Sequence, residues 1–104
     1  MYNIVLLCQW GASTEMVGER IIEAAKKKGI DVIANAYAIT EIHSVIDGAD
    51  VILLGPQVRF KLRSLLKEFG HKGVPFVVME PEDYGRMNGE NLLNAALKAI
   101  ENNQ

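Results

Sequence analysis

The sequence predicts an α/β fold in which parallel strands are covered by helices on both faces. Four short apolar runs recur along the 104 residues, at 4–7, 32–38, 51–54 and 76–79, and each is followed by a stretch with helical spacing. The runs are largely continuous in their apolar character, which is typical of strands buried on both sides. No linker, internal repeat or low-complexity segment divides the chain, so we expect 1–104 to form a single domain.

The first helix is predicted directly after the first strand, with Ser13 or Thr14 as its N-cap. Its apolar positions share one face and are Val17, Ile21, Ala24 and Ala25. The lysines at 26–28 and Gly29 are typical of a helix end, because cations complement the dipole there and glycine suits the position just beyond.

The remaining helices are predicted from the same three-to-four-residue spacing. After the second strand, Thr40 is the expected N-cap of a short helix whose apolar side is Ile39, Ile42, Val45 and Ile46. After the third strand the pattern continues through Val58, Leu62, Leu65, Leu66 and Phe69, and Gly70 is expected to close that helix. The last helix is indicated by Leu93, Ala96, Leu97 and Ile100.

Composition excludes several classes of function. The formal net charge of −2 and the pI of about 5.6 give no positive field that would attract nucleic acid or anionic lipid. No apolar stretch approaches the roughly 18 to 20 residues that cross a bilayer, and the first residues lack the basic start of a signal peptide. One cysteine forms no internal disulfide. We therefore expect a cytoplasmic protein that does not span the membrane.

Cys8 is the candidate nucleophile, because it stands where the first strand gives way to a turn of small residues. A thiol at that junction faces the positive end of a helix dipole and the unpaired N–H groups of the first turn, which favour a thiolate. The same N–H groups would hold a phosphate. The alternative is that Cys8 is a small hydrophobic residue at the end of a buried strand.

Three loops are predicted to meet at the carboxyl edge of the sheet, where ligands bind in such folds: 8–14, 55–57 and 80–89. Gln57 would lie beside the cysteine loop and either support it or contact a partner. Tyr84 would border the cysteine and face a docked partner, or pack within its own loop. His43 and His71 lack the spacing of a metal site, so neither a metal nor another cofactor is predicted.

A phosphatase is one possible use of this loop. Low-molecular-weight tyrosine phosphatases use a similar cysteine loop on a similar fold, with an arginine six positions after the cysteine, where this chain has Thr14. Without a guanidinium to stabilise a transferring phosphoryl group, holding and passing on that group is favoured over hydrolysis. Asp83 could imitate the phosphatase general acid or be a solvated loop residue.

Three motifs carry a resemblance to a known family. They are Cys8-x-x-Gly11-x-Ser13-Thr14, the run Ala49-Asp50-Val51-Ile52-Leu53-Leu54-Gly55-Pro56-Gln57-Val58, and Tyr84-Gly85-x-Met87-x-Gly89. Together they resemble the enzyme IIB proteins of the lactose/cellobiose branch of the bacterial sugar phosphotransferase system, over nearly the whole chain. The resemblance implies a four-stranded parallel sheet with helices on both faces, similar to the low-molecular-weight tyrosine phosphatase fold.

The resemblance also implies a function and partners. Proteins of this family take a phosphoryl group from a histidine of enzyme IIA and give it to a sugar bound in the membrane subunit IIC, and the phosphorylated residue is the cysteine, here Cys8. The substrate class would be β-linked disaccharides such as cellobiose, chitobiose or lactose. Two partners that use one edge in turn imply transient interfaces and a monomer.

The phosphate-binding loop implied by the resemblance comprises Gln9, Trp10, Gly11, Ala12, Ser13, Thr14 and Glu15, with backbone N–H groups from Gly11 to Glu15 holding the oxygens. Gln9-Trp10 is bulkier than is usual in the family, and Glu15 replaces a small or hydroxyl residue. A carboxylate pointing inward would repel a phosphorylated cysteine, so we expect Glu15 to point to solvent.

Two alternatives stay open beside the carrier hypothesis. One is a phosphatase or arsenate reductase on the same scaffold. The other is a flavin-binding domain, because a hydroxyl-rich loop after the first strand also suits a flavin phosphate. Arg59, Lys61 and Arg63 are expected to form a solvated face, with an acidic partner as the alternative reading.

Overall fold

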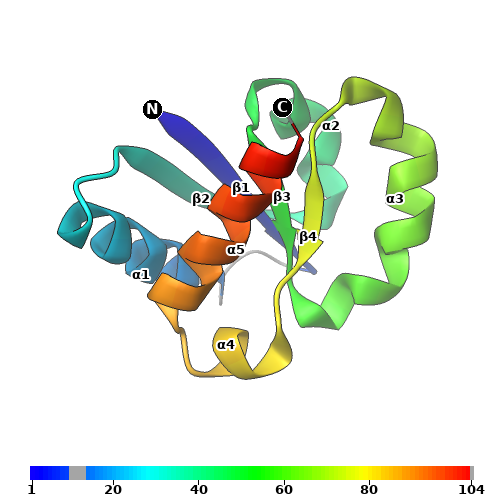
Figure 1. Ribbon diagram of the computed structural model, residues 1–104. Helices are drawn as coiled ribbons and strands as arrows, with labels where there is room; N and C mark the ends of the chain where they lie inside the picture. Colours follow the sequence, from blue (N-terminus) through cyan, green and yellow to red (C-terminus); the bar gives the residue numbers. More distant parts are fainter. Residues whose placement is uncertain (10–13, 104) are drawn as a thin grey trace.

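The computed structural model describes residues 1–9 and 14–103. Its centre is a four-stranded parallel sheet in the order β2-β1-β3-β4. Helices cover both faces, and α4 lies beyond the carboxyl ends of the strands (Figure 1). This confirms the predicted α/β architecture.

The strands fall on the four predicted apolar runs: β1 (Tyr2–Cys8), β2 (Val32–Ala38), β3 (Val51–Leu54) and β4 (Phe76–Val78). β1 is longer than its run at both ends, because pairing with β2 continues from the first strand residue to Cys8. The two central strands, β1 and β3, have fully buried side chains on both faces over most of their length, which is why their sequences do not alternate.

One face of the sheet packs against α1 (Thr14–Lys27) and α5 (Gly89–Asn102). Ile4 and Leu6 of β1 enter this core, where they meet Ile21 of α1 and Leu93 of α5. α1 begins at Thr14, and its predicted apolar face lies in or against this core. Gly29, just after the helix, adopts the left-handed conformation, with φ of 70°.

The other face packs against α2 (Ile42–Val45) and α3 (Leu62–Phe69) and receives Val5 and Leu7 of β1. Successive β1 side chains therefore enter opposite cores, as the pleat of a strand requires. Short 3-10 turns flank these helices at Ile39–Glu41, Ile46–Gly48, Pro56–Lys61 and Gly70–Lys72.

Several details on this face differ from the sequence prediction. Thr40 is not an N-cap: it lies inside a 3-10 turn, where the Glu41 carboxylate instead accepts a 2.8 Å hydrogen bond from the Ala38 N–H. Leu66 is 46% exposed and not part of the core. Gly70 does close α3 as its C-cap, as predicted, but with a helical φ of −59°; the left-handed glycine is Gly73, after the 3-10 turn, with φ of 75°.

The segment expected to be an entirely irregular loop after β4 contains α4 (Pro81–Gly85). Pro81 occupies the first turn, where its missing N–H costs nothing. A helix of five residues has no apolar periodicity to reveal it in the sequence. Within the described residues, no helix is both long and apolar enough to cross a membrane.

Candidate functional site

Cys8 is the last residue of β1 and is 4% exposed. It stands opposite Ala38, the last residue of β2, in the parallel register. On the other side the Gly55 N–H donates a 2.8 Å hydrogen bond to the carbonyl oxygen of Leu7. The three strands therefore end together, and Cys8 lies at the centre of the carboxyl edge of the sheet, as predicted for a ligand site in this fold.

Gly55 leaves room for the Gln57 side chain beside Cys8. A Cβ atom at this position would lie 3.4 Å from Cys8 Cβ and 2.5 Å from Gln57 Oε1. The Gln57 side chain thus folds back over the glycine and occupies the space that any other residue would need. The Gln57 side chain can take this position because residue 55 has no side chain.

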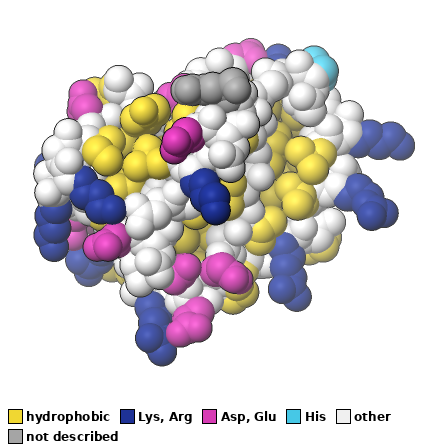
Figure 2. Space-filling view, in the orientation of Figure 1, with side chains coloured by type: hydrophobic (Ala, Val, Ile, Leu, Met, Phe, Trp, Pro, Cys, Tyr) yellow, Lys and Arg dark blue, Asp and Glu magenta, His cyan; other side chains and the backbone are white. Residues whose placement is uncertain are grey.

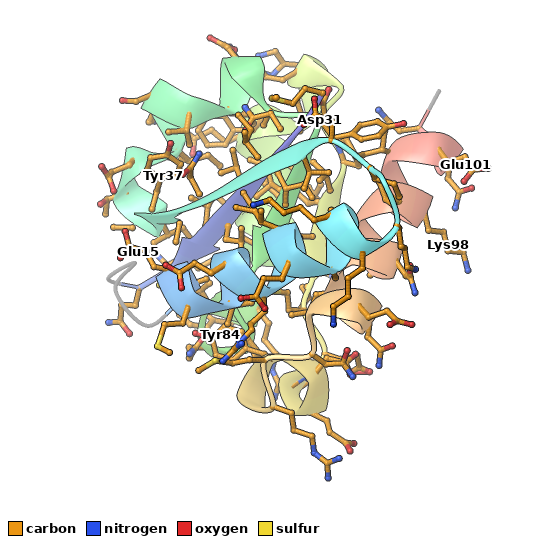
Figure 3. The ribbon with its side chains drawn as sticks, turned by 90° about the vertical axis from the view of Figure 1, so that its left-hand side faces the viewer. Glu15, Asp31, Tyr37, Tyr84, Lys98 and Glu101 are labelled. Atoms are coloured by element: carbon orange, nitrogen blue, oxygen red, sulfur yellow. The ribbon has the colours of Figure 1, made fainter. Side chains whose placement is uncertain are left out.

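Tyr84 connects two of the loops predicted to meet here. Its hydroxyl lies 3.1 Å from Thr14 Oγ1, and it accepts a 3.2 Å hydrogen bond from Gln57 Nε2. Thr14 is the first residue of α1 and is completely buried. The structure therefore brings together Thr14, Gln57 and Tyr84 from three separate segments, and in Figure 3 Tyr84 lies beneath the start of α1.

The segment that carries Tyr84 is tied to α5. Asp83 Oδ1 accepts a 2.9 Å hydrogen bond from Asn91 Nδ2, and the Asn88 side chain caps α5 by accepting from the Asn91 N–H at 3.0 Å. Asp83, the one aspartate considered as a phosphatase acid, is thus bonded to a helix and half-buried. These contacts fix the α4 backbone below the start of α1.

Glu15 is exposed in the first turn of α1. Figure 3 shows it at the same end of the molecule as Tyr37, close to the end of β2, and pointing outward. The predicted outward orientation is confirmed, so the carboxylate complements the dipole of α1. Gln9 is also exposed, whereas Trp10, Gly11, Ala12 and Ser13, which are predicted to hold the phosphate, lie outside the described residues.

A basic segment follows Gln57. Arg59, Lys61 and Arg63 are all exposed, and Phe60 between them is 74% exposed. In Figure 2 Lys and Arg side chains project from the right-hand margin, where α3 lies. All three cations are therefore solvent-exposed, Arg59 and Lys61 in the 3-10 turn before α3 and Arg63 in α3 itself.

Metal binding finds no support in the part of the chain that the structure describes, which holds no group of three or more His, Cys, Asp or Glu side chains able to coordinate an ion. His43 instead lies 3.6 Å from a Glu68 carboxylate oxygen and packs edge-on against Phe69. It lies on the α2 and α3 side, among the helices and away from Cys8.

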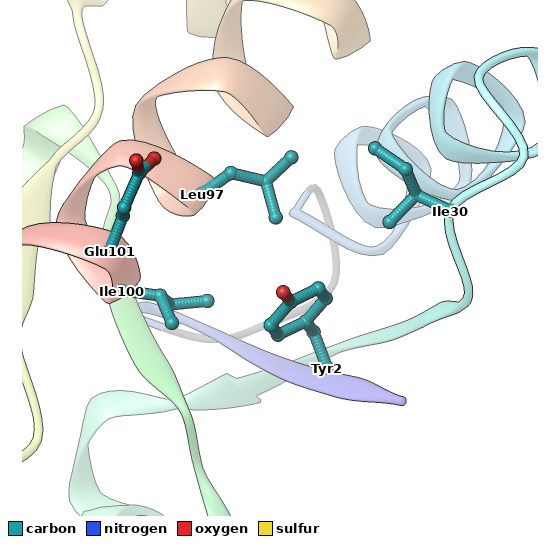
Figure 4. A pocket seen from close by; sticks show the side chains of 5 residues that line it. All are labelled: Tyr2, Ile30, Leu97, Ile100 and Glu101. Carbon is teal, nitrogen blue, oxygen red and sulfur yellow. The ribbon is translucent and has the colours of Figure 1, made fainter. Parts of the chain in front are cut away.

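A hollow of about 270 Å³ is present at the opposite edge of the sheet (Figure 4). Its lining includes Tyr2, where β1 begins, together with Ile30 and Leu97. β1 separates it from Cys8 by six residues of extended chain, roughly 20 Å. This hollow is therefore not part of the cysteine site.

Comparison with known proteins identifies the family to which the chain belongs. Residues 3–95 match the family model described as the lactose/cellobiose-specific IIB subunit of the phosphotransferase system (PTS). The chain belongs to this IIB family. The PTS IIB proteins are components of a sugar phosphotransferase system, as the resemblance of the three motifs implied.

Curated relatives agree with this membership. The chain is 36% identical over 98 residues to the PTS galactose-specific EIIB component of Lactococcus lactis subsp. cremoris, which covers 89% of this chain and 91% of that protein. The cellobiose-specific EIIB component of Lactococcus lactis subsp. lactis matches with the same identity and coverage.

Solved structures share the fold. The solution structure of the cellobiose-specific IIB component from Borrelia burgdorferi is 41% identical, has a TM-score of 0.82, and the match covers 99% of this chain and 94% of that one. YwlE from Bacillus subtilis, in a mutant crystal structure, has a TM-score of 0.61 at 14% identity, with 94% and 98% covered. This likeness confirms the predicted similarity to the low-molecular-weight tyrosine phosphatase fold.

Sequence reasoning named Thr14, Gln57 and Tyr84 individually but missed their mutual hydrogen bonds. Thr14 and Tyr84 are 70 residues apart in the chain, and Tyr84 and Gln57 are 27 apart. A sequence pattern indicates which side chains reach a sheet edge, whereas their pairing depends on where α4 is held. The available signal was that all three follow strand ends of one parallel sheet.

Proposed function

We propose that this IIB protein accepts a phosphoryl group on Cys8 from a histidine of enzyme IIA and delivers it to a sugar bound by the membrane subunit IIC. The observation that carries the proposal is the place of Cys8, which ends the central strand at the carboxyl edge, six residues before the first turn of α1. A helix N-terminus offers N–H groups and a positive dipole to the anion that would form there.

In the first proposed transfer, from the IIA histidine to Cys8, atoms and charge balance. Cys8 Sγ forms a bond to phosphorus, the bond from phosphorus to the imidazole nitrogen breaks, and the thiol proton ends on that nitrogen. In the second transfer a sugar hydroxyl oxygen attacks phosphorus, the S–P bond breaks, and the hydroxyl proton balances the released thiolate. Such transfers depend mainly on alignment and charge stabilisation.

The loop 9–15 is the proposed cradle for the phosphoryl oxygens. Thr14 and Glu15 begin α1, so their backbone N–H groups belong to the four that a helix leaves without internal partners. Because Glu15 is exposed, its carboxylate is proposed to point to solvent and to add no negative charge beside the phosphoryl group. Gln57 and Tyr84, whose side chains are hydrogen-bonded to each other, are proposed to contact the docked partners.

The proposed setting follows from this role. A carrier that serves IIA and IIC in turn would act in the cytoplasm as a monomer and associate only briefly with the membrane subunit. Curated relatives are named galactose-specific, cellobiose-specific and oligo-beta-mannoside-specific. A β-linked disaccharide is the proposed substrate class for this chain.

Phosphorus NMR tests the chemistry directly. After incubation with phosphoenolpyruvate and the upstream phosphotransferase components, including IIA, the protein should give a thiophosphate resonance that is absent from the Cys8→Ser variant. Thermal unfolding of both proteins verifies that the variant is folded. A phosphorylated Cys8→Ser protein, or an unphosphorylated parent, would contradict the proposal.

Two further measurements address the alternatives. Rapid turnover of a generic aryl phosphate by the isolated protein would favour a phosphatase over a carrier. Uptake of flavin by the purified protein would favour the flavin-binding alternative. Under the proposal, both assays give no signal while the phosphorylated Cys8 accumulates.

A further inference from the structure

We propose that Tyr84 is a positioning residue for phosphoryl transfer, whose hydroxyl holds the start of α1 in place relative to Cys8. The inference rests on the proposed function of Cys8, because it concerns the geometry of the same transfer. It assigns the Tyr84 hydroxyl a role inside the protein, distinct from contact of the tyrosine ring with a partner.

The first support is the bond at the start of α1. Thr14 is completely buried, and its Oγ1 lies 3.1 Å from the Tyr84 hydroxyl. In a helix of 14 residues, the first residue sets where the unpaired N–H groups of the first turn point. A side chain that fixes Thr14 therefore fixes the anion-binding end of α1.

The second support is the bond on the other side of Cys8. Gln57 Nε2 donates to the Tyr84 hydroxyl at 3.2 Å. The same glutamine packs its Oε1 over Gly55, and a Cβ atom added at Gly55 would lie 3.4 Å from Cys8 Cβ. The Tyr84 hydroxyl thus joins the two segments that border Cys8, one from α1 and one from the turn after β3.

The third support is the rigidity of the element behind Tyr84. The Tyr84 N–H donates to the Glu80 carbonyl oxygen at 2.9 Å, and the Asn88 N–H donates to the Asp83 carbonyl oxygen at 2.8 Å. Because the Asp83 carboxylate is also hydrogen-bonded to Asn91 of α5, the backbone that carries the Tyr84 ring is held in place. A hydroxyl carried on a rigid backbone restrains the side chains that are hydrogen-bonded to it. A hydroxyl on a mobile loop would instead move with those side chains.

This role predicts a particular kinetic signature. Loss of a positioning contact lowers the rate of transfer once the donor is bound, because alignment in the transition state is impaired. Loss of a docking contact raises the donor concentration needed for half-saturation. Since Tyr84→Phe removes the hydroxyl and keeps the ring, it separates the two effects.

The test is single-turnover transfer from phosphorylated IIA to the full chain over a range of IIA concentrations. For Tyr84→Phe we expect the saturating rate to fall about threefold to tenfold, the range for one lost side-chain hydrogen bond, with the half-saturating concentration unchanged. Gln57→Leu should lower the rate as well, and the double variant should be no slower than Tyr84→Phe alone, because both changes break one bridge.

Tyr2→Phe is the matched control, because it removes a phenol hydroxyl at the opposite end of β1 and should leave both parameters unchanged. A Tyr84→Phe protein with the parent's saturating rate, or with only a raised half-saturating concentration, would overturn the positioning role. Multiplicative effects of the two substitutions would overturn the shared bridge. Failure of the parent itself to accept phosphate would instead refute the proposed function of Cys8.

Discussion

The contact between α1 and α5 yields a sharp prediction about stability. Gly89 is the first residue of α5, and a Cβ there would lie 2.2 Å from the Arg20 carbonyl oxygen, 2.5 Å from the carbonyl carbon and 3.0 Å from the Ile21 nitrogen. All three are backbone atoms, so no side-chain rotation relieves the overlap. Gly89→Ala must therefore push the two helices apart by close to 1 Å.

The size of the effect follows from the packing that would be disturbed. α1 and α5 share one core with Ile21, Leu92 and Leu93, each at most 2% exposed. Overpacking of such a core costs about 1 to 3 kcal/mol, and an immovable backbone neighbour favours the upper part of that range. Alanine recovers less than about 1 kcal/mol of helix propensity at a helix start. We expect Gly89→Ala to lower the free energy of unfolding by about 2 kcal/mol.

Urea unfolding followed by circular dichroism measures this difference. Gly70→Ala is the matched control, because Gly70 has a helical φ of −59° and no atom within 4 Å of its added Cβ. That variant should unfold at the parent's midpoint or be stabilised by up to about 1 kcal/mol. If Gly89→Ala proved as stable as Gly70→Ala, the close approach of α5 to Arg20 would not constrain the fold, and the reasoning would be refuted.

Two further predictions concern the cysteine site and the support beneath it. Gly55→Ala should displace the Gln57 side chain, because its Oε1 would lie 2.5 Å from the added Cβ. We expect phosphoryl acceptance in the single-turnover assay to slow about threefold, with the free energy of unfolding within about 1 kcal/mol of the parent's. A rate equal to the parent's would contradict this prediction. Asn88→Ala removes the cap of α5 and should cost about 1 kcal/mol in urea unfolding; an unchanged midpoint would show that the cap is replaced.

The sheet could be predicted from the sequence because its signal is local. Val51–Leu54 is completely apolar and was predicted with the bounds that the structure has. β1 and β4 differ from their runs by one or two residues, where pairing and not side-chain polarity sets the end. The order of the strands in the sheet is only partly predictable from the apolar runs, because which strands pair depends on packing between segments that are distant in the sequence.

The α2 and α3 face was predicted less well, since short elements carry little periodicity. α2 has four residues, and 3-10 turns on both sides of it bury Ile39 and Ile46 without a continuous helix. Leu66 fits the apolar spacing of α3, yet it is 46% exposed because the helix presents Leu65 and Phe69 to the sheet. Spacing alone did not decide which edge of the apolar stripe would face the core.

Thr14 shows how a sequence difference acquires its physical meaning in the structure. It stands six residues after Cys8, where phosphatases with a similar loop carry an arginine, and the sequence alone indicated only that a guanidinium is missing. In the fold this side chain is completely buried and bonded to Tyr84, which in turn is bonded to Gln57.

A long cationic side chain at position 14 would have to displace Tyr84 and release α4 from the start of α1. The packing between α1 and α4, as well as the loop sequence, thus excludes a guanidinium at position 14. It follows that exchanging Thr14 alone would disrupt the bridge before it could supply a phosphatase-like charge. The buried hydroxyl that stands in place of the arginine is the one that lies 3.1 Å from the Tyr84 hydroxyl.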